Sequence, residues 1–283
     1  MKPQDIFELI SSQYFRLTNS EKKVADYVLA YRADIQYMSI SELAAECAVA
    51  DATISRFCRR LGLGGYNAFK LELAKASMNA QAVLRPEGGA GRADFEAMCH
   101  SRLQESVSAL EQTVARLDPV AMEQAVNLMH GAGRVLCMGQ GSSMVLAEEA
   151  WTLLSSISPK FVLVPDSHQQ MAALALLEEG DAVLYFSYSG STRELQDAME
   201  VAHLRKGRVI LITRFPKSPG GQKADVVLQC GSNEGPLQAG SVPARMAQLF
   251  VLDLLYTQLF QQAPEQAAAC RERIAEAIAR RHI

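Results

Sequence analysis

The sequence predicts an all-α N-terminal domain joined to a doubly wound α/β domain with a parallel sheet. Three observations predict this arrangement. Apolar side chains recur at helical spacing through the first 78 residues. The segment 79–92 is rich in Gly and Ala and loses that spacing. From residue 134 onward, short apolar runs alternate with helical patterns. We therefore expect a helical domain over 1–78, a linker over 79–92 and an α/β domain over 93–283.

The composition is that of a soluble globular protein. Of the 283 residues, 49% are hydrophobic and 21% are charged, which suffices for a modest core in each domain. No apolar run approaches the ~18 residues that a membrane helix needs. The N-terminal residues lack the apolar core of a signal peptide. We expect no membrane contact and a cytoplasmic location.

The six cysteines and five histidines are scattered along the chain. The sequence contains no C-x-x-C pair, no H-E-x-x-H motif and no Cys/His cluster, which are the spacings that zinc sites use. Most of the cysteines fall within apolar patterns, which favours reduced core thiols. We expect no metal site and no cofactor.

Three short helices are expected in the N-terminal domain. They follow Ser20, Ser39 and Asp51, which are residue types that cap helices. A short turn, residues 48–50, separates the second helix from the third, and Gly62 is suited to ending the third. Helix, short turn and helix is an arrangement that places the later helix in a DNA groove.

The third of these helices has a basic outer face. Its periodicity turns Ile54, Phe57 and Leu61 inward. Short polar side chains at its N-terminal turn would allow close approach to base edges, while longer arginines would reach bases or phosphates. Between residues 52 and 75 five cations stand against one acid, which indicates a negatively charged partner. An ordinary three-helix bundle with a solvated basic face is the alternative.

Two turns of one design follow strands in the C-terminal domain. The apolar run 134–138 leads into Gly-Gln-Gly-Ser-Ser at 139–143, and the run 182–187 leads into Tyr-Ser-Gly-Ser-Thr at 188–192. In such turns, backbone N–H groups and hydroxyls point toward one position, and the helix that follows presents the positive end of its dipole there. Two of them in one parallel sheet would converge on one anion. For either turn alone, a simple helix cap is the alternative. The other predicted strands are 161–164, 209–213 and 226–229.

A dinucleotide site is the competing interpretation of the first turn. Gly139 and Gly141 follow a strand, as in the G-x-G-x-x-G fingerprint, but Met144 stands at the third glycine position. No acidic residue closes the strand at 161–164. The nucleotide interpretation is therefore disfavoured.

Both halves of the chain resemble one known family. The run 39–70 resembles the helix-turn-helix domain of RpiR-type regulators. The G-x-G-S-S and S-x-S-G-x-T loops, about 45 residues apart, resemble the sugar isomerase (SIS) domain that follows it in that family. SIS domains hold the phosphate of a phosphosugar in these loops. Ligand contacts are therefore expected from Gly141, Ser142, Ser143, Ser187, Ser189, Gly190, Ser191 and Thr192, with His168 as a candidate at the pocket mouth.

The resemblance also implies which residues contact DNA. Helical geometry assigns base contacts to Thr53, Ser55 and Arg56 and phosphate contacts to Arg59 and Arg60. Tyr66 and Lys70, after the Gly-Gly turn at 64–65, would add further phosphate contacts. The alternative for His168 is a capping or surface histidine, with Asp166 or Ser167 as the helix cap.

No catalytic residue is expected. Isomerising a phosphosugar requires a positioned general base, and SIS enzymes draw a glutamate from the last long helix. Residues 242–255 hold no glutamate here, and their one acid, Asp253, is expected at the packed end. We therefore expect a regulator of transcription that binds a double-stranded DNA operator under phosphosugar control, as a homodimer or homotetramer. A phosphosugar isomerase with an accessory helical domain, or a sugar-phosphate-binding partner of another protein, are the alternatives. The segments 94–117 and 263–281 are candidate subunit interfaces.

Overall fold

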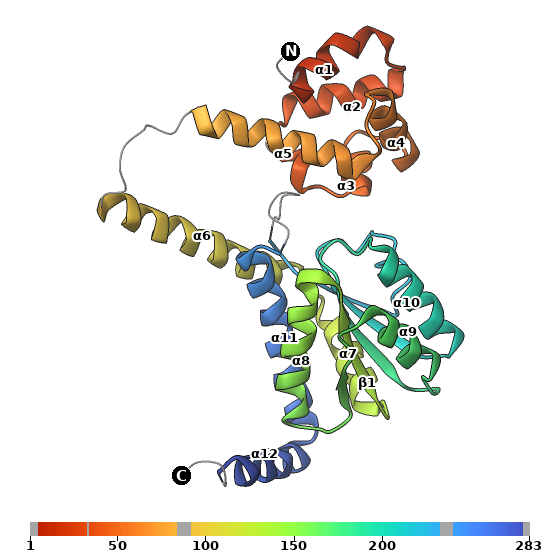
Figure 1. The fold of residues 1–283 in the computed structure, drawn as a ribbon, viewed down its shortest axis with the longest axis vertical. Coiled ribbons are helices and arrows are strands. Elements are labelled where there is room, and N and C mark those ends of the chain that lie inside the picture. The colour runs from red at the N-terminus through yellow and green to blue at the C-terminus, as the bar shows by residue number, and fades with distance from the viewer. Residues whose placement is uncertain (1–4, 33, 84–91, 233–239, 280–283) are drawn as a thin grey trace. The chain divides into compact units, whose positions relative to one another are not determined.

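A computed structural model describes residues 5–32, 34–83, 92–232 and 240–279 (Figure 1). Among these residues, one compact unit extends to His100 and a second begins at Ser101. The first unit is helical and the second holds a five-stranded sheet. The fold class predicted from the sequence is therefore confirmed.

The first unit packs its helices around one apolar core. Within that core, the rings of Phe57 and Phe69 meet edge to face with centroids 5.7 Å apart. Its elements are α1 (Ile6–Gln13), η1 (Tyr14–Arg16), α2 (Asn19–Ala30), η2 (Ile35–Tyr37), α3 (Ile40–Glu46), α4 (Asp51–Arg60) and α5 (Tyr66–Val83). Gly62, with φ +81°, follows α4 as expected.

Two helix starts in this unit differ from the sequence prediction. Helix α2 begins at a capping box in which Thr18, not Ser20, accepts from the backbone of Glu21. Helix α4 has Ala50 as its N-cap, and Asp51 lies in its first turn, where it accepts a 2.7 Å hydrogen bond from Ser41 Oγ. Asp51 therefore joins α4 to α3 instead of capping α4.

The segment predicted as linker is partly helical. Helix α5 continues through 79–83, because Asn, Ala, Gln and Val occupy these positions and no Gly or Pro occurs between Tyr66 and Pro86. Residues 84–91 lie outside the described residues, and α6 (Arg92–Arg116) follows them.

The second unit is a parallel sheet in the order β2-β1-β3-β4-β5. The five predicted strands are all present, within a residue of their predicted ends. The remaining elements are α7 (Pro119–Gly131), β1 (Val135–Gly139), η3 (Gly141–Ser143), α8 (Met144–Ser155), β2 (Phe161–Leu163), α9 (Ser167–Ala175), β3 (Ala182–Phe186), α10 (Arg193–Leu204), β4 (Arg208–Thr213), β5 (Val226–Gln229), α11 (Val242–Gln262) and α12 (Pro264–Ala279).

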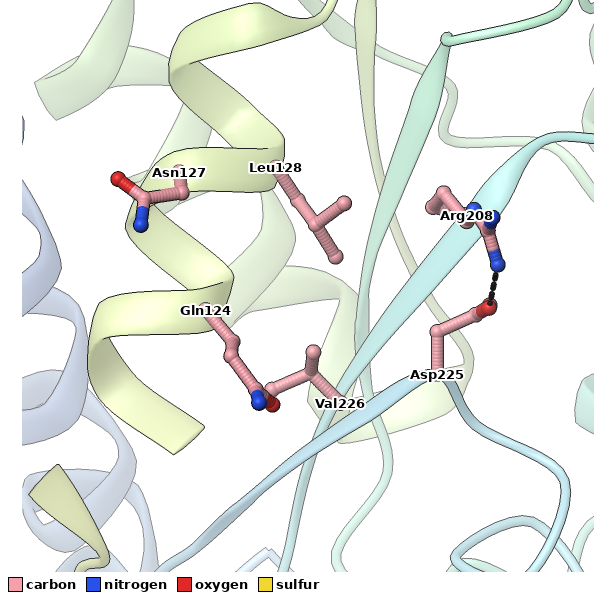
Figure 2. A pocket seen from close by; sticks show the side chains of 6 residues that line it. All are labelled: Gln124, Asn127, Leu128, Arg208, Asp225 and Val226. Carbon is pink, nitrogen blue, oxygen red and sulfur yellow. Dashed lines mark hydrogen bonds and ion pairs between the residues drawn. The ribbon is translucent and has the colours of Figure 1, made fainter. Parts of the chain in front are cut away.

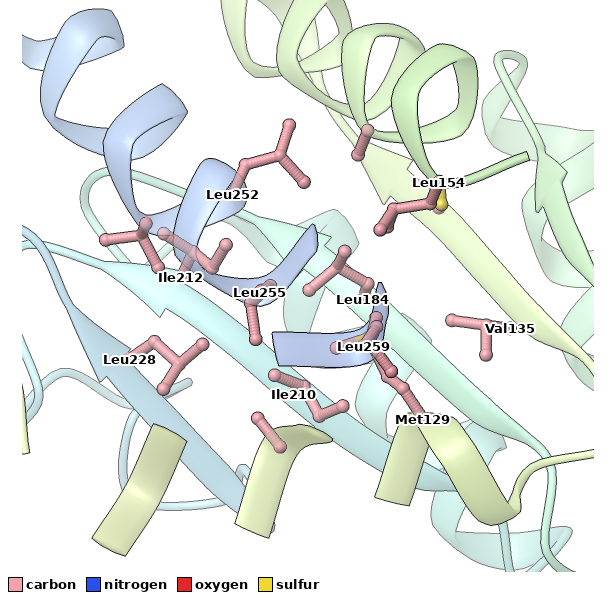
Figure 3. Close-up of a cluster of buried hydrophobic side chains, with 14 of the residues drawn as sticks. Met129, Val135, Leu154, Leu184, Ile210, Ile212, Leu228, Leu252, Leu255 and Leu259 are labelled. Carbon is pink, nitrogen blue, oxygen red and sulfur yellow. The ribbon is translucent and has the colours of Figure 1, made fainter. Parts of the chain in front are cut away.

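Helices cover both faces of this sheet, as Figure 1 shows. On one face α7, α8 and α11 pack against inward-facing strand residues such as Leu184 and Ile210 (Figure 3). On the other face α9 and α10 pack against residues such as Val183 and Leu211. Strands β1, β3 and β4 therefore read as nearly continuous apolar runs, as expected of a sheet buried on both faces. Among the described residues, no helix combines the length and apolar character needed to cross a membrane.

Candidate anion site and nucleic-acid interface

The two hydroxyl-rich loops begin side by side at the carboxyl edge of the sheet. Strand β1 pairs with β2 on one side and β3 on the other, so the chain order reverses at the β1/β3 position. Ligands of open α/β sheets bind at such a switch point. Gly139 lies opposite Phe186 at the end of the shared ladder, where neighbouring strands are about 4.8 Å apart. Loop 1 (residues 140–143) and loop 2 (residues 187–192) therefore start next to each other.

Loop 1 is a tight turn that depends on glycine. A Cβ added to Gly139 would lie 2.6 Å from the Ser143 carbonyl oxygen, so only glycine fits there. Gly141 adopts φ +55°, and the Ser143 backbone N–H donates to the Gln140 carbonyl at 3.0 Å. Ser142 is exposed. The close fold leaves Ser142 on the outer surface of the loop and Ser143 half-buried.

Loop 2 closes on itself in the same manner. The Gly190 backbone N–H donates to Ser187 Oγ at 3.2 Å, and Gly190 has φ +60°. Any Cβ at Gly190 would overlap Ser218 Oγ. The side chains of Ser189 and Ser191 are exposed, and Ser191 Oγ donates to the Ser189 carbonyl at 3.0 Å.

Hydrogen bonds from the end of β4 and the segment after it, residues 213–220, hold loop 2 in place. The Tyr188 carbonyl accepts hydrogen bonds from Thr213 Oγ1 at 3.0 Å and from the Arg214 backbone N–H at 3.1 Å. The Gly190 carbonyl accepts from the Gly220 backbone N–H at 2.8 Å. Sequence reasoning missed these supporting residues, because nothing in the local sequence around 213–220 marks a contact with a loop more than twenty residues earlier.

The helices that follow the two loops begin with hydroxyl residues that do not cap them. Ser143 before α8 and Thr192 before α10 make no side-chain hydrogen bond to their own helix. Thr192 Oγ1 is buried and has no partner among the described residues. In contrast, Asp118, Asp166 and Ser241 each accept from the first turn of α7, α9 and α11. Two helix N-termini with unused hydroxyls suit a phosphate group.

His168 lies exposed in the first turn of α9, after β2. Asp166 caps this helix by accepting from the backbone N–H groups of His168 and Gln169 at 3.0 Å, as one of the two capping alternatives expected. Within the described residues the His168 ring makes no hydrogen bond to either loop. The edge at which it lies is that of the loops, because parallel strands end on one side.

Asp253 is exposed, so its expected place at a packed end is wrong. Helical spacing turns Val251, Leu252 and Leu255 into the core and leaves Asp253 on the outer face of α11. The described part of the second unit has no group of three His, Cys, Asp or Glu residues that could hold a metal ion.

Two pockets lie in the second unit, one at the sheet edge opposite the loops and one beside the first turn of α8, which directly follows loop 1. One, of about 430 Å³, opens at the amino ends of β4 and β5, where Arg208 donates to Asp225 at 2.7 Å (Figure 2). Burial alone would raise the pKa of Asp225, but hydrogen bonds from Val209, Arg208 and His203 outweigh it and lower the pKa. The other, of about 320 Å³, lies between α8 and α11 and is lined by Glu149 and Arg245 among apolar residues.

In the first unit, α3 and α4 form the helix pair expected of a DNA-binding domain. Arg56 and Arg59 are exposed on α4, and Ser55 is half-buried beside them. Thr53 is buried, and its Oγ1 accepts from Arg56 Nη2 at 3.3 Å. The structure therefore places Thr53 as a support for Arg56, whereas Ser55, Arg56 and Arg59 share the open face.

Arg60 is tied into the fold of the same unit. Its Nε lies 3.0 Å from Glu21 Oε1, and its Nη1 donates to the Arg16 carbonyl at 3.2 Å. The Arg60 side chain is 43% exposed and that of Glu21 only 4%. Burial alone would raise the pKa of Glu21, but hydrogen bonds from Thr18 and Arg60 outweigh it and hold the pKa below its usual range. Arg60 thus has a structural partner in addition to any ligand.

Tyr66 is buried rather than presented on the surface. Its hydroxyl donates to the Met38 carbonyl at 3.1 Å, and burial raises the pKa of this phenol. Lys70 Nζ lies 5.6 Å from the centre of the Tyr66 ring. Tyr66 therefore connects α5 to the segment before α3, while its hydroxyl is already used within the domain.

Comparison with known proteins agrees with the interpretation of both the N-terminal and the C-terminal domain. Residues 4–80 match the helix-turn-helix domain of the rpiR family, and residues 128–258 match the SIS domain. An HTH-type transcriptional regulator of Haemophilus influenzae is 32% identical over 287 residues, which cover 100% of this chain and 99% of that protein. This chain belongs to the rpiR family. The expectation of a transcription regulator, and not an enzyme, is confirmed by these relatives.

Solved structures extend the likeness of this rpiR-family chain. The Vibrio vulnificus NanR protein complexed with ManNAc-6P superposes with a TM-score of 0.84 and 26% identity, over 97% of this chain and 98% of that chain. The sugar isomerase domain of an RpiR transcription factor from Sphaerobacter thermophilus has a TM-score of 0.56 and 23% identity, over 62% of this chain and 96% of that chain. The second likeness supports the fold of the second unit alone.

Proposed function

We propose that this rpiR-family regulator binds an operator through α3 and α4 and that a phosphosugar bound at loops 1 and 2 changes its affinity for that DNA. The observation that carries the proposal is the pair of helix N-termini at the β1/β3 edge. Both carry hydroxyl residues that leave their own helix uncapped. A phosphate dianion has the charge and the acceptor oxygens to fill that position.

The ligand contacts in this proposal come from loops 1 and 2, with His168 toward the sugar. On α4, Arg56 and Ser55 face the bases and Arg59 a phosphate. Arg60 and Lys70 add positive charge nearby, while Thr53 and Tyr66 act by holding Arg56 and α5 in place. ManNAc-6P is the first ligand to test, because NanR was solved in complex with it.

Control of DNA binding requires two arrangements of the protein that differ in affinity for the phosphosugar. The ligand then shifts the population toward the arrangement it prefers. We further propose that the regulator acts in the cytoplasm as a homodimer or homotetramer, because two helix-turn-helix domains spaced by about one DNA turn, ~34 Å, bind two half-sites.

The test is binding of the full-length protein to a fluorescent duplex from its own upstream region, in a salt series and with a panel of phosphosugars. Thr192→Val keeps the size of the side chain and removes the unpaired hydroxyl. Its matched control is Thr152→Val, because the Thr152 hydroxyl bonds only within α8. We expect Thr192→Val to weaken the sugar response and leave sugar-free DNA binding intact. Specific DNA binding that no phosphosugar alters, or turnover of a phosphosugar, would overturn the proposal.

A further inference from the structure

Gln170 has a buried side-chain amide that hydrogen-bonds through both its nitrogen and its oxygen to residues at the start of loop 1 and the ends of β1 and β2. It lies in the first turn of α9, and the residue is only 3% exposed. Its Nε2 donates to the Gly139 carbonyl at 3.1 Å and to the Val164 carbonyl at 2.9 Å. Its Oε1 accepts from Gln140 Nε2 at 2.8 Å. One carboxamide thus bonds the end of β1, the end of β2 and the first residue of loop 1.

The position of these contacts explains why an amide is needed. Strands β1 and β2 pair as far as Cys137 and Leu163, and the Val164 backbone N–H still donates to the Cys137 carbonyl at 3.3 Å. Past that bond, the carbonyls of Gly139 and Val164 both point at Gln170. A primary amide supplies two N–H donors for two acceptors and one oxygen for Gln140. Leaving buried carbonyls unbonded is costly.

We propose that Gln170 is the positioning residue of the phosphosugar site, fixing loop 1 and the start of α9 as one unit. Loop 1 supplies phosphate contacts, and α9 carries His168 toward the sugar. Gln170 sets the spacing between the two without touching the ligand. The ligand part of this inference rests on the proposed function, whereas the ordering of loop 1 by Gln170 does not.

The sharpest variant is Gln170→Glu, which keeps the shape of the side chain. The carboxylate still accepts from Gln140, but it places a negative oxygen against two carbonyl oxygens in place of two N–H donors. The matched control is Gln248→Glu in α11. Gln248 is 2% exposed, and its one hydrogen bond among the described residues goes to the Ala244 carbonyl in its own helix at 3.3 Å. Both variants bury a carboxylate in one unit, and of these two glutamines only Gln170 hydrogen-bonds loop 1 among the described residues.

Amide hydrogen exchange of the full-length protein tests the ordering of loop 1. We expect Gln170→Glu to speed exchange about fivefold or more in peptides covering 139–146 and the first turn of α9, with 187–195 unchanged. Gln248→Glu should leave 139–146 as in the wild type. Unchanged exchange at 139–146, or equal acceleration across the whole sheet, would overturn the proposal. If Gln170→Glu does not fold, Gln140→Leu removes one of the three bonds and should give the same pattern more weakly.

Calorimetry with the phosphosugar panel tests the effect on the ligand. Affinity should fall about fivefold or more in Gln170→Glu and remain at the wild-type value in Gln248→Glu. Equal affinity of Gln170→Glu and wild type would overturn the role in the site. If the wild-type protein binds no phosphosugar, the proposed function fails, and the exchange experiment still decides whether Gln170 orders loop 1.

Discussion

The two arginines at the end of α4 separate DNA contact from domain stability. Sequence geometry gives Arg59 and Arg60 the same role on the DNA backbone. In the structure Arg60 bonds Glu21 and the Arg16 carbonyl, while Arg59 is exposed and has no hydrogen bond or ion pair to any described residue. Replacing each by alanine in turn therefore removes one positive charge from the same surface, with different consequences for the fold.

The contacts of Arg60 determine how much the two variants should differ in the stability of the first unit. A hydrogen bond to a charged group contributes about 1.5–3 kcal/mol. Arg60 is 43% exposed, so solvent screening reduces that figure, and Glu21 keeps its hydrogen bonds to Thr18. We expect Arg60→Ala to destabilise the first unit by about 1–2 kcal/mol, which is roughly 5–30-fold in its opening equilibrium. Arg59→Ala should change stability by less than about 0.5 kcal/mol.

Hydrogen exchange in α2 and α4 of the full-length chain measures this difference. The fluorescence of Trp151 does not, because the sole tryptophan lies on α8 in the second unit. In a salt series of DNA binding, each variant should lower the slope by about 0.9 if its arginine contacts one phosphate. Equal exchange rates in the two variants would refute the structural role of the Arg60–Glu21 pair. An unchanged salt slope in Arg59→Ala would refute the docking of this face on DNA.

Three further outcomes follow from the same structure. The pKa of Glu21 is lowered in the folded state. Its ionised carboxylate therefore stabilises the first unit above the unfolded pKa of about 4.3, and this stabilisation is lost as pH falls through the folded pKa. Glu21→Gln should flatten that pH dependence in an acid titration followed by hydrogen exchange. Exposed Cys99 should react first with a thiol reagent, since burial raises the pKa of Cys47 to about 11, and Cys99→Ser should remove the fast phase. Gly190→Ala, which forces a Cβ into Ser218 Oγ at φ +60°, should abolish the sugar response while sugar-free DNA binding persists.

Local patterns were enough to predict the elements that position the site. The apolar runs of β1 and β3 and the turns after them are continuous stretches of sequence, so their place at the carboxyl edge follows from the parallel sheet alone. The predicted start of α2 differs from the observed start because two candidate cap residues lie close together in the sequence. Thr18 immediately precedes α2 and Ser20 lies in its first turn, and only Thr18 has a glutamate three residues later.

Contacts between distant residues could not be predicted in this way. Arg60 meets Glu21 across 39 residues, and Gln170 meets Gly139 across 31. Helical geometry placed Arg60 and Tyr66 on an outer surface, but the packing of α2 and η2 against α4 and α5 gives both of them partners inside the domain. Which side chains have partners depends on the whole fold, and periodicity in one helix does not contain that information.

The same limit explains why the two loops were ambiguous from the sequence. A serine or threonine before a helix is either a cap or a free ligand group, and the residue types are identical in the two cases. Thr18 and Ser39 bond their own helices, so their hydroxyls contribute to stability and are unavailable. Ser143 and Thr192 do not, and they stand at neighbouring strand ends. A helix N-terminus without its cap keeps unbonded N–H groups for another acceptor. At α8 the preceding turn already bonds the N–H groups of Ser143 and Met144, so this helix start adds chiefly the Ser143 hydroxyl. Together with the uncapped start of α10, that hydroxyl favours an anion at this edge of the sheet.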